Sequence, residues 1–453
     1  MSFTRTVATI FSLDRMQQAL TNRKLRRRQK QQKKKELPSE ISDIFIDLGT
    51  ATATINSGGE YGKFTYENYR NGVTIQRESK HVRTIVAWKN SRTRAAIMLI
   101  GPWQKWKQSR ADYKALKEKT VKENKAAKAQ SFDVSDTKES GVEAIGQSAF
   151  ERWDRDPNLR FERAVRRGNV GCVKSYRCLL RYMIRMRFKW FEWSFEELRV
   201  RPTIYIGVPE TADDHHISSI KWIIEKDLHA NAVFVREQIA DLIGGRRSSD
   251  QQPIPFRGSK SVAIANLGGG TNDIAVACNG KVIHIKSFET AGDAMDEDIV
   301  KLLRNKKLQI GNPTAIEIKE TIGSALAIDG VADDEVFEVY GTSTETNRPG
   351  SVKITRAEIR ECLLPVCNRI VEDFNSFLEK LEDNPEIHAD IKNGVIYLSG
   401  GASQLPGLAK YISKKTKLEI ELVANPFTSV IEGLIAIKEN EDLLGLGVIK
   451  MAA

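Results

Sequence analysis

Three glycine-rich turns of this 453-residue sequence contain residue types that can bind phosphate. In the first, an apolar strand at 44–48 carries Asp47, and a tight turn with Gly49 and Thr50 leads into a second strand that ends at Ile55. Backbone N–H groups and hydroxyls in such a turn can cradle a phosphate, and a carboxylate at the strand end can face a metal ion. Because plain turns often contain the same residues, this β-hairpin indicates a phosphate site only together with other motifs.

The same order of residues recurs at 261–276, where an apolar strand reaches Asn266 and then a turn of three glycines, Thr271 and Asn272. Two such hairpins about 220 residues apart indicate an internally duplicated α/β fold whose halves face each other across a cleft and clamp a phosphate chain. A third segment, at 394–408, combines a strand, the glycines at 400 and 401, and a helix start. Glycines at such a place let a flat ring approach the backbone.

In this order, the three turns resemble the first phosphate loop, the second phosphate loop and the adenosine loop of the actin, Hsp70 and sugar-kinase ATPases. Within that superfamily the sequence is most similar to bacterial actins of the MreB type, through DLGTAT at 47–52, GGGT at 268–271 and SGGA at 399–402. Segments at 206–209, 291–297 and 310–325 agree as well, so the resemblance covers about residues 41–100 and 140–448. Lys319-Glu320 is also similar to MamK, the magnetosome-aligning actin, which leaves MreB-like and MamK-like assignments open.

The resemblance implies an α/β, two-lobed actin-like fold, which is a duplicated ribonuclease-H-like fold with a nucleotide cleft. The implied division places a basic tail at 1–40 and lobe I at 41–240, with a small subdomain that carries a charged insertion at about 89–142. Lobe II then covers 241–424, with a small subdomain at about 292–350, and residues 425–453 return to lobe I.

ATP and Mg²⁺ are the cofactors that the resemblance implies. It assigns Asp47 as the metal-side carboxylate, acting through water, and Glu237 as the residue that positions the attacking water. Thr271 falls beside Glu237, near the terminal phosphate. The residues expected to bind the nucleotide are Gly49, Thr50, Ala51, Thr52, Gly268, Gly269, Gly270, Thr271, Asn272, Lys319, Glu320, Gly323, Gly400, Gly401 and Ala402.

Two departures from the family pattern bear on turnover. Asn266 fills a metal-side position that usually holds Asp, and an amide can hydrogen-bond a metal-bound water but cannot balance charge or accept a proton. The Pro that usually follows the glutamate is Gln238, and the acid that usually precedes it is Arg236. Removing one charged group at such a site often lowers the rate by orders of magnitude. Slow hydrolysis and nucleotide binding with negligible hydrolysis therefore both stay open.

The net charge of +11 lies almost entirely in the first 35 residues, which hold eleven Lys or Arg and one acid, Asp14. The rest of the chain is nearly neutral, so no specific nucleic-acid partner is expected for it. An amphipathic segment at 2–20 is followed by nine basic residues within 23–35, a pattern typical of docking on an anionic membrane surface. A disordered solvated arm, and a tail that binds nucleic acid or an acidic protein nonspecifically, are the alternatives.

A second charged stretch, at 103–139, carries ten basic and six acidic residues and predicts a protruding helix, either solvated or partner-binding. Apolar residues at 179–186 predict an amphipathic helix packed on a sheet. The five cysteines lack CxxC spacing and are expected to be reduced thiols. No apolar run approaches about 20 residues, so we expect a cytoplasmic, cytoskeletal protein, at the inner membrane face if the tail docks there.

The function expected from these features is that of a nucleotide-dependent, filament-forming bacterial actin whose main partner is itself. The alternative is a non-polymerising member of the superfamily, either an Hsp70-like chaperone ATPase or a sugar kinase. A kinase would need a catalytic base beside a sugar pocket, for which the sequence offers no candidate. Cell shape, organelle positioning and segregation all stay open as cellular roles, as does the choice between ATP and GTP.

Overall fold

A computed structural model of the chain describes residues 43–48, 52–57, 60–61, 64–70, 73–79, 81–83, 85–89, 142–145, 147–153, 159–166, 169–188, 195, 200–440 and 442–443. The chain divides into two units, Met1–Ser42 and Asp43–Ala453, and all described residues belong to the second. The basic tail, the charged stretch at 103–139 and the first-turn residues Gly49, Thr50 and Ala51 lie outside the described residues.

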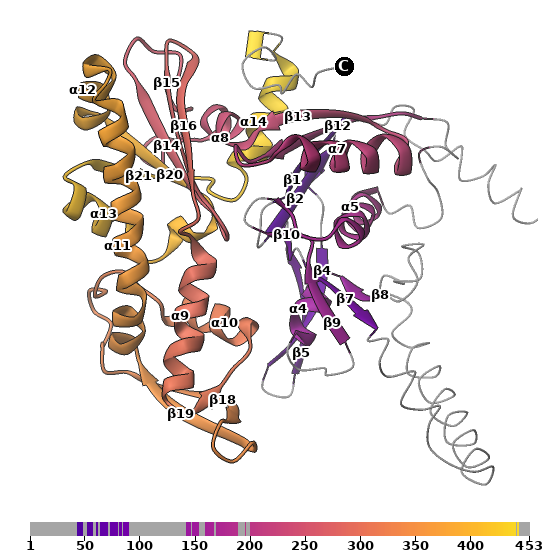
Figure 1. Cartoon of the computed structure of the whole chain (residues 1–453), viewed down its shortest axis with the longest axis vertical. Coiled ribbons are helices and arrows are strands. Elements are labelled where there is room, and N and C mark those ends of the chain that lie inside the picture. Colours follow the sequence, from indigo (N-terminus) through magenta and orange to yellow (C-terminus); the bar gives the residue numbers. More distant parts are fainter. Residues whose placement is uncertain are drawn as a thin grey trace, which may run out of the picture. The chain divides into compact units, whose positions relative to one another are not determined.

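The first large sheet begins with the predicted hairpin, β1 (Ile44–Leu48) and β2 (Thr52–Ser57), which pair antiparallel. Its strand order is β13-β12-β1-β2-β3, where β12 (Thr203–Val208) and β13 (Asn231–Arg236) run parallel to β1 and β3 is Glu60–Tyr61. Helix α5 (Val173–Phe188) precedes β12 along the chain, and α7 (Asp214–Trp222) with the π-helical turn Ile223–Asp227 joins β12 to β13 (Figure 1).

The second large sheet repeats this topology. Its order is β16-β15-β14-β20-β21, made of β14 (Val262–Leu267), β15 (Asn272–Cys278), β16 (Lys281–Phe288), β20 (Val395–Ser399) and β21 (Glu419–Leu422). Again a hairpin with a third antiparallel strand lies beside two parallel strands. Helices α11 (Arg356–Leu381) and α12 (Pro385–Asn393) precede β20 along the chain, and α13 (Leu408–Thr416) precedes β21. The matching order and directions confirm the internal duplication predicted from the two hairpins.

Smaller elements are inserted into each half. In the first half these are the pair β4 (Phe64–Arg70) and β5 (Val73–Ser79), strand β6 (His81–Arg83) paired with β2, helix α4 (Gln147–Arg152), the sheet β7 (Ile85–Lys89), β8 (Val142–Ile145) and β9 (Leu159–Arg163), and the pair β10 (Val165–Arg166) and β11 (Asn169–Val170). In the second half they are α9 (Gly292–Asn305), α10 (Asn312–Ile322) and the sheet β17 (Leu308–Gln309), β18 (Val336–Ser343) and β19 (Pro349–Thr355).

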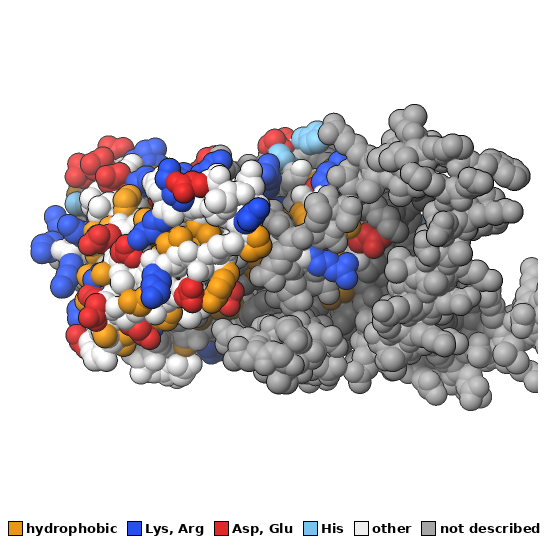
Figure 2. All heavy atoms as spheres, turned by 90° about the horizontal axis from the view of Figure 1, so that it is seen from below, with side chains coloured by type: hydrophobic (Ala, Val, Ile, Leu, Met, Phe, Trp, Pro, Cys, Tyr) orange, Lys and Arg blue, Asp and Glu red, His pale blue; other side chains and the backbone are white. Residues whose placement is uncertain are grey.

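Exposed apolar side chains accumulate near β18. Val336 and Tyr340 on this strand are 56% and 70% exposed, and Ile328 and Val331 before it are 36% and 37% exposed. Figure 2, which looks at the molecule from below the view of Figure 1, shows hydrophobic side chains among acidic and basic ones over the described part of that face. Clustered exposed apolar residues are a feature of interaction surfaces.

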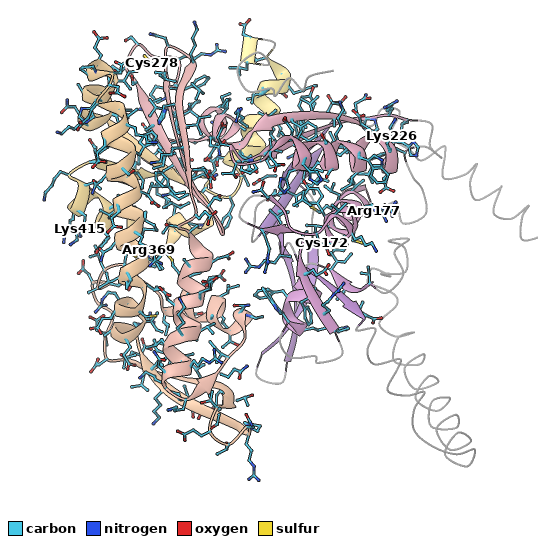
Figure 3. All side chains as sticks on the ribbon, in the orientation of Figure 1. Cys172, Arg177, Lys226, Cys278, Arg369 and Lys415 are labelled. Carbon is cyan, nitrogen blue, oxygen red and sulfur yellow. The ribbon has the colours of Figure 1, made fainter. Side chains whose placement is uncertain are left out.

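Helix α5 has the amphipathic character predicted for 179–186. Leu179, Leu180, Met183 and Ile184 are buried, and the helix contacts β2 and β7. Figure 3 shows Cys172 and Arg177 at the start of this helix and Cys278 at the end of β15, and all five cysteines carry free thiols. None of the helices in the described part of the chain has the length and apolarity that crossing a membrane requires.

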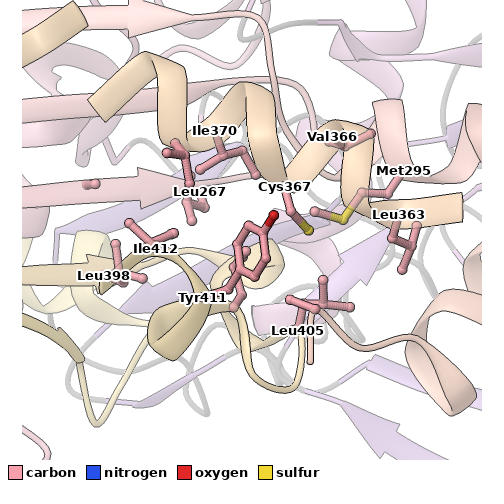
Figure 4. Packing of buried hydrophobic residues seen from close by; sticks show 14 of the residues in the cluster. Leu267, Met295, Leu363, Val366, Cys367, Ile370, Leu398, Leu405, Tyr411 and Ile412 are labelled. Carbon is pink, nitrogen blue, oxygen red and sulfur yellow. The ribbon is translucent and has the colours of Figure 1, made fainter. Parts of the chain in front are cut away.

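The largest core joins α11 to the second sheet. Thr355 and Glu358 form a capping box that starts α11, and every third or fourth residue of the helix is then buried. Figure 4 shows Leu363, Val366, Cys367 and Ile370 from this helix facing Leu267 of β14, Leu398 of β20 and Tyr411 of α13. Full burial of one aliphatic side chain contributes about 1.5–3 kcal/mol, so this core holds the ends of β14 and β20 in place.

Two helices touch each other without intervening side chains. Helix α8 (Glu237–Gly244) follows β13, and α14 (Ser429–Glu439) crosses it. A Cβ atom on Gly433 would lie 1.8 Å from the carbonyl oxygen of Ala240, and one on Gly244 would lie 1.9 Å from that of Ser429. Around this crossing, Val235, Ile239, Val430 and Leu434 form a buried cluster with Phe45 of β1. Glycine is therefore required at both contact points.

Gly433→Ala is expected to lower the free energy of unfolding by about 3 kcal/mol, because the added methyl group forces two helix backbones apart. Thermal and urea denaturation of the full chain would measure the change. Gly350→Ala is the matched control, since the nearest atom to its Cβ would be Ser343 Cβ at 3.6 Å, and its effect should stay within about 0.5 kcal/mol. Equal midpoints for the two variants would contradict the close crossing.

Candidate functional site

The duplicated sheets place two polar side chains at corresponding strand ends. Asp47 lies near the end of β1 and pairs with Thr54, while Asn266 lies near the end of β14 and pairs with Asp273. Each is followed by a leucine and then the first glycine of its turn. Asn266 is thus the internal counterpart of Asp47, with a neutral amide in place of a carboxylate.

The second glycine turn is fixed to the start of α9. Gly268 donates its N–H to the carbonyl of Thr271 at 2.9 Å, which closes the turn. The carbonyls of Gly268 and Gly269 accept hydrogen bonds from the N–H groups of Gly292 and Asp293, at 3.2 and 2.7 Å. The turn is therefore held in one conformation by a helix that begins beside it.

Glu237 is the first residue of α8 and enters the site directly from the end of β13. Gly207 on β12 makes room for it, because a Cβ atom there would lie 2.9 Å from Glu237 Cγ. The preceding residue, Arg236, forms an ion pair with Glu210. Strand β12 and this ion pair thus flank Glu237.

Four buried or half-buried carboxyl groups lie near one another and have raised pKa values. Burial, with the charge of Asp241, raises the pKa of Asp47 from 3.8 to about 7. Burial also raises the pKa of Glu237 well above its usual range, and the neighbouring carboxylates, first that of Asp47, raise it further. Burial raises the pKa of Asp241 to about 6 and that of Asp273 above its usual range. A cation would stabilise the charged forms of all four.

Hydrogen bonds from the second sheet hold two of these acids. Asp241 Oδ2 accepts from the amide Nδ2 of Asn266 at 3.0 Å and from the hydroxyl of Ser399. Asp273 Oδ2 accepts from the hydroxyl of Thr271 at 2.7 Å. Because these donors favour the charged carboxylates, they partly offset the effect of burial on the pKa values of Asp241 and Asp273.

The third glycine turn lies against the end of β14. Gly400 has φ of +80°, and a Cβ atom there would lie 2.5 Å from both Asn266 Oδ1 and the carbonyl oxygen of Leu267. Gly401 lies beside the ring of Phe427, which is 39% exposed and 3.1 Å from the position of a Cβ atom on this glycine. The turn thus requires glycine at position 400 and has a partly exposed aromatic ring beside Gly401.

Several predicted nucleotide-binding residues meet around Gly292. A Cβ atom on Gly292 would lie 3.4 Å from both Gly268 O and Lys319 Nζ, and 3.5 Å from Ala402 Cβ. Lys319 itself donates to the carbonyl of Gly292 at 3.1 Å and forms a 2.8 Å ion pair with Asp296 of α9. The second turn, the third turn and α10, which also carries Glu320 and ends before Gly323, therefore converge at the start of α9.

The residues fit an Mg²⁺ ion that binds together with a nucleotide. Within the described ranges, no three His, Cys, Asp or Glu side chains are placed to hold a metal ion. Mg²⁺ typically keeps several waters and contacts one or two carboxylates and phosphates. Asp47 and Asn266 could face such an ion. The Oδ1 atoms of Asp241 and Asp273 are buried without hydrogen-bond partners of normal geometry among the described residues, although the hydroxyls of Ser429 and Ser287 act on these two carboxyl groups.

Comparison with known protein families shows to which family the chain belongs. The MreB/Mbl protein family matches residues 127–445. The chain belongs to this family. The MreB/Mbl assignment is supported by a cell shape-determining protein MreB of Pasteurella multocida, 27% identical over 299 residues that cover 64% of this chain and 80% of that protein. A cell shape-determining protein Mbl of Bacillus cereus is 27% identical over 305 residues, which cover 67% of this chain and 86% of that protein.

Solved structures of MreB and MamK share the fold of this MreB/Mbl-family chain. MreB5 of Spiroplasma citri bound to ADP matches with a TM-score of 0.63 and 20% identity, covering 88% of this chain and 96% of that chain. A MamK double helical filament matches with a TM-score of 0.56 and 17% identity, covering 88% and 99%. The predicted α/β, two-lobed actin-like fold and the predicted resemblance to bacterial actins are both confirmed.

The sites predicted from the sequence come together only in part within the described residues. The second turn, the third turn and Lys319 meet around Gly292, and Glu237 lies with Asp47 in the carboxyl cluster. For Thr52 only its place in β2 is described. The sequence reasoning missed Gly207, Asp241 and Asp273 as parts of this site. Asp241 follows Glu237 by four residues, a spacing that puts both on one helix face and could have indicated it.

The raised pKa of Asp47 predicts a pH-dependent stability for the nucleotide-free protein. Because the folded state binds this proton more tightly than the unfolded state, the stabilisation is complete below about pH 4 and is lost as pH rises through about 7. Asp47→Asn has no such proton, so its thermal midpoint relative to wild type should rise between pH 5 and pH 8, by at least about 2 °C.

Differential scanning calorimetry in EDTA would measure this change. Asp333→Asn serves as the control, because the Arg360 guanidinium holds the pKa of Asp333 below its usual range and this acid does not titrate between pH 5 and pH 8. Its midpoint relative to wild type should differ by the same amount at both pH values. The same constancy for Asp47→Asn would contradict the assignment.

Proposed function

We propose that this MreB/Mbl-family chain binds ATP with Mg²⁺ at its two hairpin turns and assembles with copies of itself into filaments. The observation that carries the proposal is the pair of equivalent hairpins, whose strand ends place Asp47 and Asn266 beside a cluster of buried carboxyl groups. MreB5 of Spiroplasma citri, which shares the fold, is bound to ADP in one structure and to AMPPNP in another. The turns would supply backbone donors to phosphates, and the ion would balance the carboxylates.

The proposed residue roles follow the assignments made from the sequence. Gly49, Thr50, Ala51 and Thr52 of the first turn and Gly268, Gly269, Gly270, Thr271 and Asn272 of the second hold the phosphates. Lys319 and Glu320 of α10, with Gly323 directly after it, line the ribose side, and Gly400, Gly401 and Ala402 line the adenosine side, where the partly exposed Phe427 ring lies beside Gly401. Asp47 holds the metal ion through water, and Asn266 does so with an uncharged amide.

We assign slow hydrolysis to Glu237 and Thr271. The Thr271 hydroxyl donates its proton to Asp273, so its lone pairs remain free to accept from a water. Glu237 can orient the same water only when its carboxyl group is charged, and burial and its acidic neighbours oppose that state. Mg²⁺ supplies positive charge when bound with the nucleotide, which favours the charged carboxylate.

An ion pair connects the second glycine turn to β9, which is distant in the sequence. Arg163 of β9 pairs with Asp293 in the first turn of α9, and both side chains are largely buried, with 19% and 25% exposed. The N–H of Asp293 also donates to the carbonyl of Gly269 in the second turn. A phosphate bound in that turn would therefore act on the same residue that holds β9. We propose this contact as the route by which nucleotide state biases the arrangement of the halves.

Two observations support self-association. The MamK neighbour is a double helical filament, and the apolar residues Ile328, Val331, Val336 and Tyr340 are exposed at and before β18. A head-to-tail contact of this kind does not close on itself and gives filaments. The curated relatives are named for cell shape, which favours a shape-determining scaffold over the magnetosome role of MamK for this chain.

The full chain is expected to sediment in the presence of ATP and Mg²⁺ and to remain in the supernatant in EDTA. In the same samples, Glu237→Gln should bind ATP as wild type does but release phosphate at least about tenfold more slowly, because a neutral amide no longer attracts and orients the attacking water. Sedimentation and a phosphate-release assay would measure both outcomes.

Glu432→Gln is the matched control for this substitution. Glu432 lies on α14 and pairs with Arg246 outside the carboxyl cluster, so phosphate release should match wild type. A protein that stays in the supernatant with ATP and Mg²⁺ would favour the non-polymerising alternative. Identical release by Glu237→Gln and wild type would remove the role assigned to Glu237.

We further propose that residues 1–35, which lie outside the described residues, hold filaments at an anionic membrane surface. Their composition supports this, since ten of the eleven net positive charges of the chain lie there. Replacing Arg26, Arg27 and Arg28 by Gln should weaken binding to phosphatidylserine vesicles about 100-fold, at about 1 kcal/mol per charge. Cosedimentation with these vesicles and with neutral ones would measure it, and equal binding by the variant, or by a chain without residues 1–35, would contradict the proposal.

A further inference from the structure

Because position 266 holds an asparagine, the second glycine turn of the proposed metal and nucleotide site has no carboxylate equivalent to Asp47. The duplicated topology makes it the counterpart of Asp47, and both residues precede a glycine turn by two positions. The first sheet therefore presents a carboxylate where the second presents an amide. If nothing replaced that charge, the second turn would contribute less to holding a divalent cation beside the phosphates.

A carboxylate does lie directly behind this amide. Asp241 is fully buried on α8, and its Oδ2 accepts the 3.0 Å hydrogen bond from Asn266 Nδ2. The same oxygen accepts from the hydroxyl of Ser399, the residue that precedes Gly400. Asp241 is thus held by residues that lead into the second and third glycine turns, although it belongs to the helix that begins with Glu237.

This hydrogen bond determines which atom of Asn266 faces the turns. With Nδ2 directed at Asp241, Asn266 Oδ1 lies 3.8 Å from the position of a Cβ atom on Gly268 and 2.5 Å from that of one on Gly400. The amide therefore presents its acceptor oxygen between the two turns. A carboxylate that accepts from the N–H group of a ligating side chain both orients it and makes its oxygen more basic.

The second oxygen of Asp241 gives an independent sign that positive charge would be favourable here. Asp241 Oδ1 is buried and has no hydrogen-bond partner of normal geometry among the described residues, although the Ser429 hydroxyl also acts on this carboxyl group and lowers its pKa. Leaving a buried carboxylate oxygen without a partner is unfavourable unless positive charge lies nearby. Among the described residues, the charged groups that act on Asp241, Asp47 and Glu237 at this point are acids.

We propose that Asp241 is a positioning residue that supplies, through Asn266, the negative charge missing from the second turn. The Asp241 carboxylate orients the amide, so that Asn266 Oδ1 would accept a hydrogen bond from a water of a nucleotide-bound Mg²⁺, and the charge of Asp241 would attract the ion. This inference rests on the proposed nucleotide binding. It goes further in naming an acid on a different helix as the replacement for the one absent at 266.

The test measures how Mg²⁺ changes the affinity of the full chain for a fluorescent ATP analogue, by titration at saturating Mg²⁺ and in EDTA. Asp241→Asn keeps the side-chain shape and an acceptor for Asn266 but removes the charge. It should reduce the gain in affinity caused by Mg²⁺ about tenfold, with affinity in EDTA little changed. The double variant Asp241→Asn with Asn266→Asp moves the charge to the strand and should restore the gain to within about threefold.

Asp390→Asn is the matched control. Asp390 accepts from the N–H of Ser261 at 2.8 Å, at the opposite end of β14 from Asn266, so its removal tests whether any acid bonded to this strand has the same effect. The gain from Mg²⁺ should be unchanged in this variant. The thermal midpoint of nucleotide-free Asp241→Asn should equal or exceed that of wild type, because an unbalanced buried charge is removed.

Three results would overturn the inference. A normal gain from Mg²⁺ in Asp241→Asn with a lowered thermal midpoint would show that Asp241 only stabilises the fold. If the double variant gained no more affinity from Mg²⁺ than Asp241→Asn alone, a negative charge at position 266 would not replace that of Asp241. Absence of nucleotide binding by wild type would remove the proposed function together with this inference, whereas either of the first two results would leave that function standing.

Discussion

The contact between α8 and α14 determines where the carboxyl groups of the site can lie. Gly244 and Gly433 bring the backbones of the two helices into direct contact. A shift of either helix would break this contact, so the two helices keep a fixed relative position. Helix α8 starts at the end of β13 in the first sheet and contacts β14 and β15 of the second. The position of α8 therefore determines both the packing of Glu237 against Gly207 of β12 and the hydrogen bond between Asp241 and Asn266.

This position has an electrostatic consequence. Glu237 and Asp241 are four residues apart on one face of α8, where like charges repel, and the nearby carboxylates of Asp47 and Asp273 add to this repulsion. The fold offsets this repulsion with donors from the second sheet, since Asn266, Ser399 and Thr271 all direct hydrogen bonds at these acids. The offset is incomplete, as the raised pKa values show. Under the proposed function, nucleotide-bound Mg²⁺ would complete this offset and would so couple ion binding to the stability of the helix crossing.

Local patterns in the sequence predicted the hairpins, the duplication and the strand ends that carry Asp47 and Asn266, because each depends on residues adjacent in the chain. The predicted boundary between 240 and 241 lies inside α8, since a helix that serves both sheets has no break in composition. Asp241 was missed for a related reason. Its partners are Asn266, 25 residues away, and Ser399, 158 residues away, and only tertiary structure brings them together.

An acid that acts through an amide is not equivalent to one at the strand end. The charge of Asp241 attracts a cation over a short distance whether or not an amide intervenes, because Coulomb attraction in a buried site falls off slowly. Asn266, however, cannot take a proton from a metal-bound water, and the buried Asp241 is separated from that water by the amide. The arrangement therefore favours holding the nucleotide over cleaving it. Under the proposed function, a chain of this kind would keep its bound ATP long after assembly.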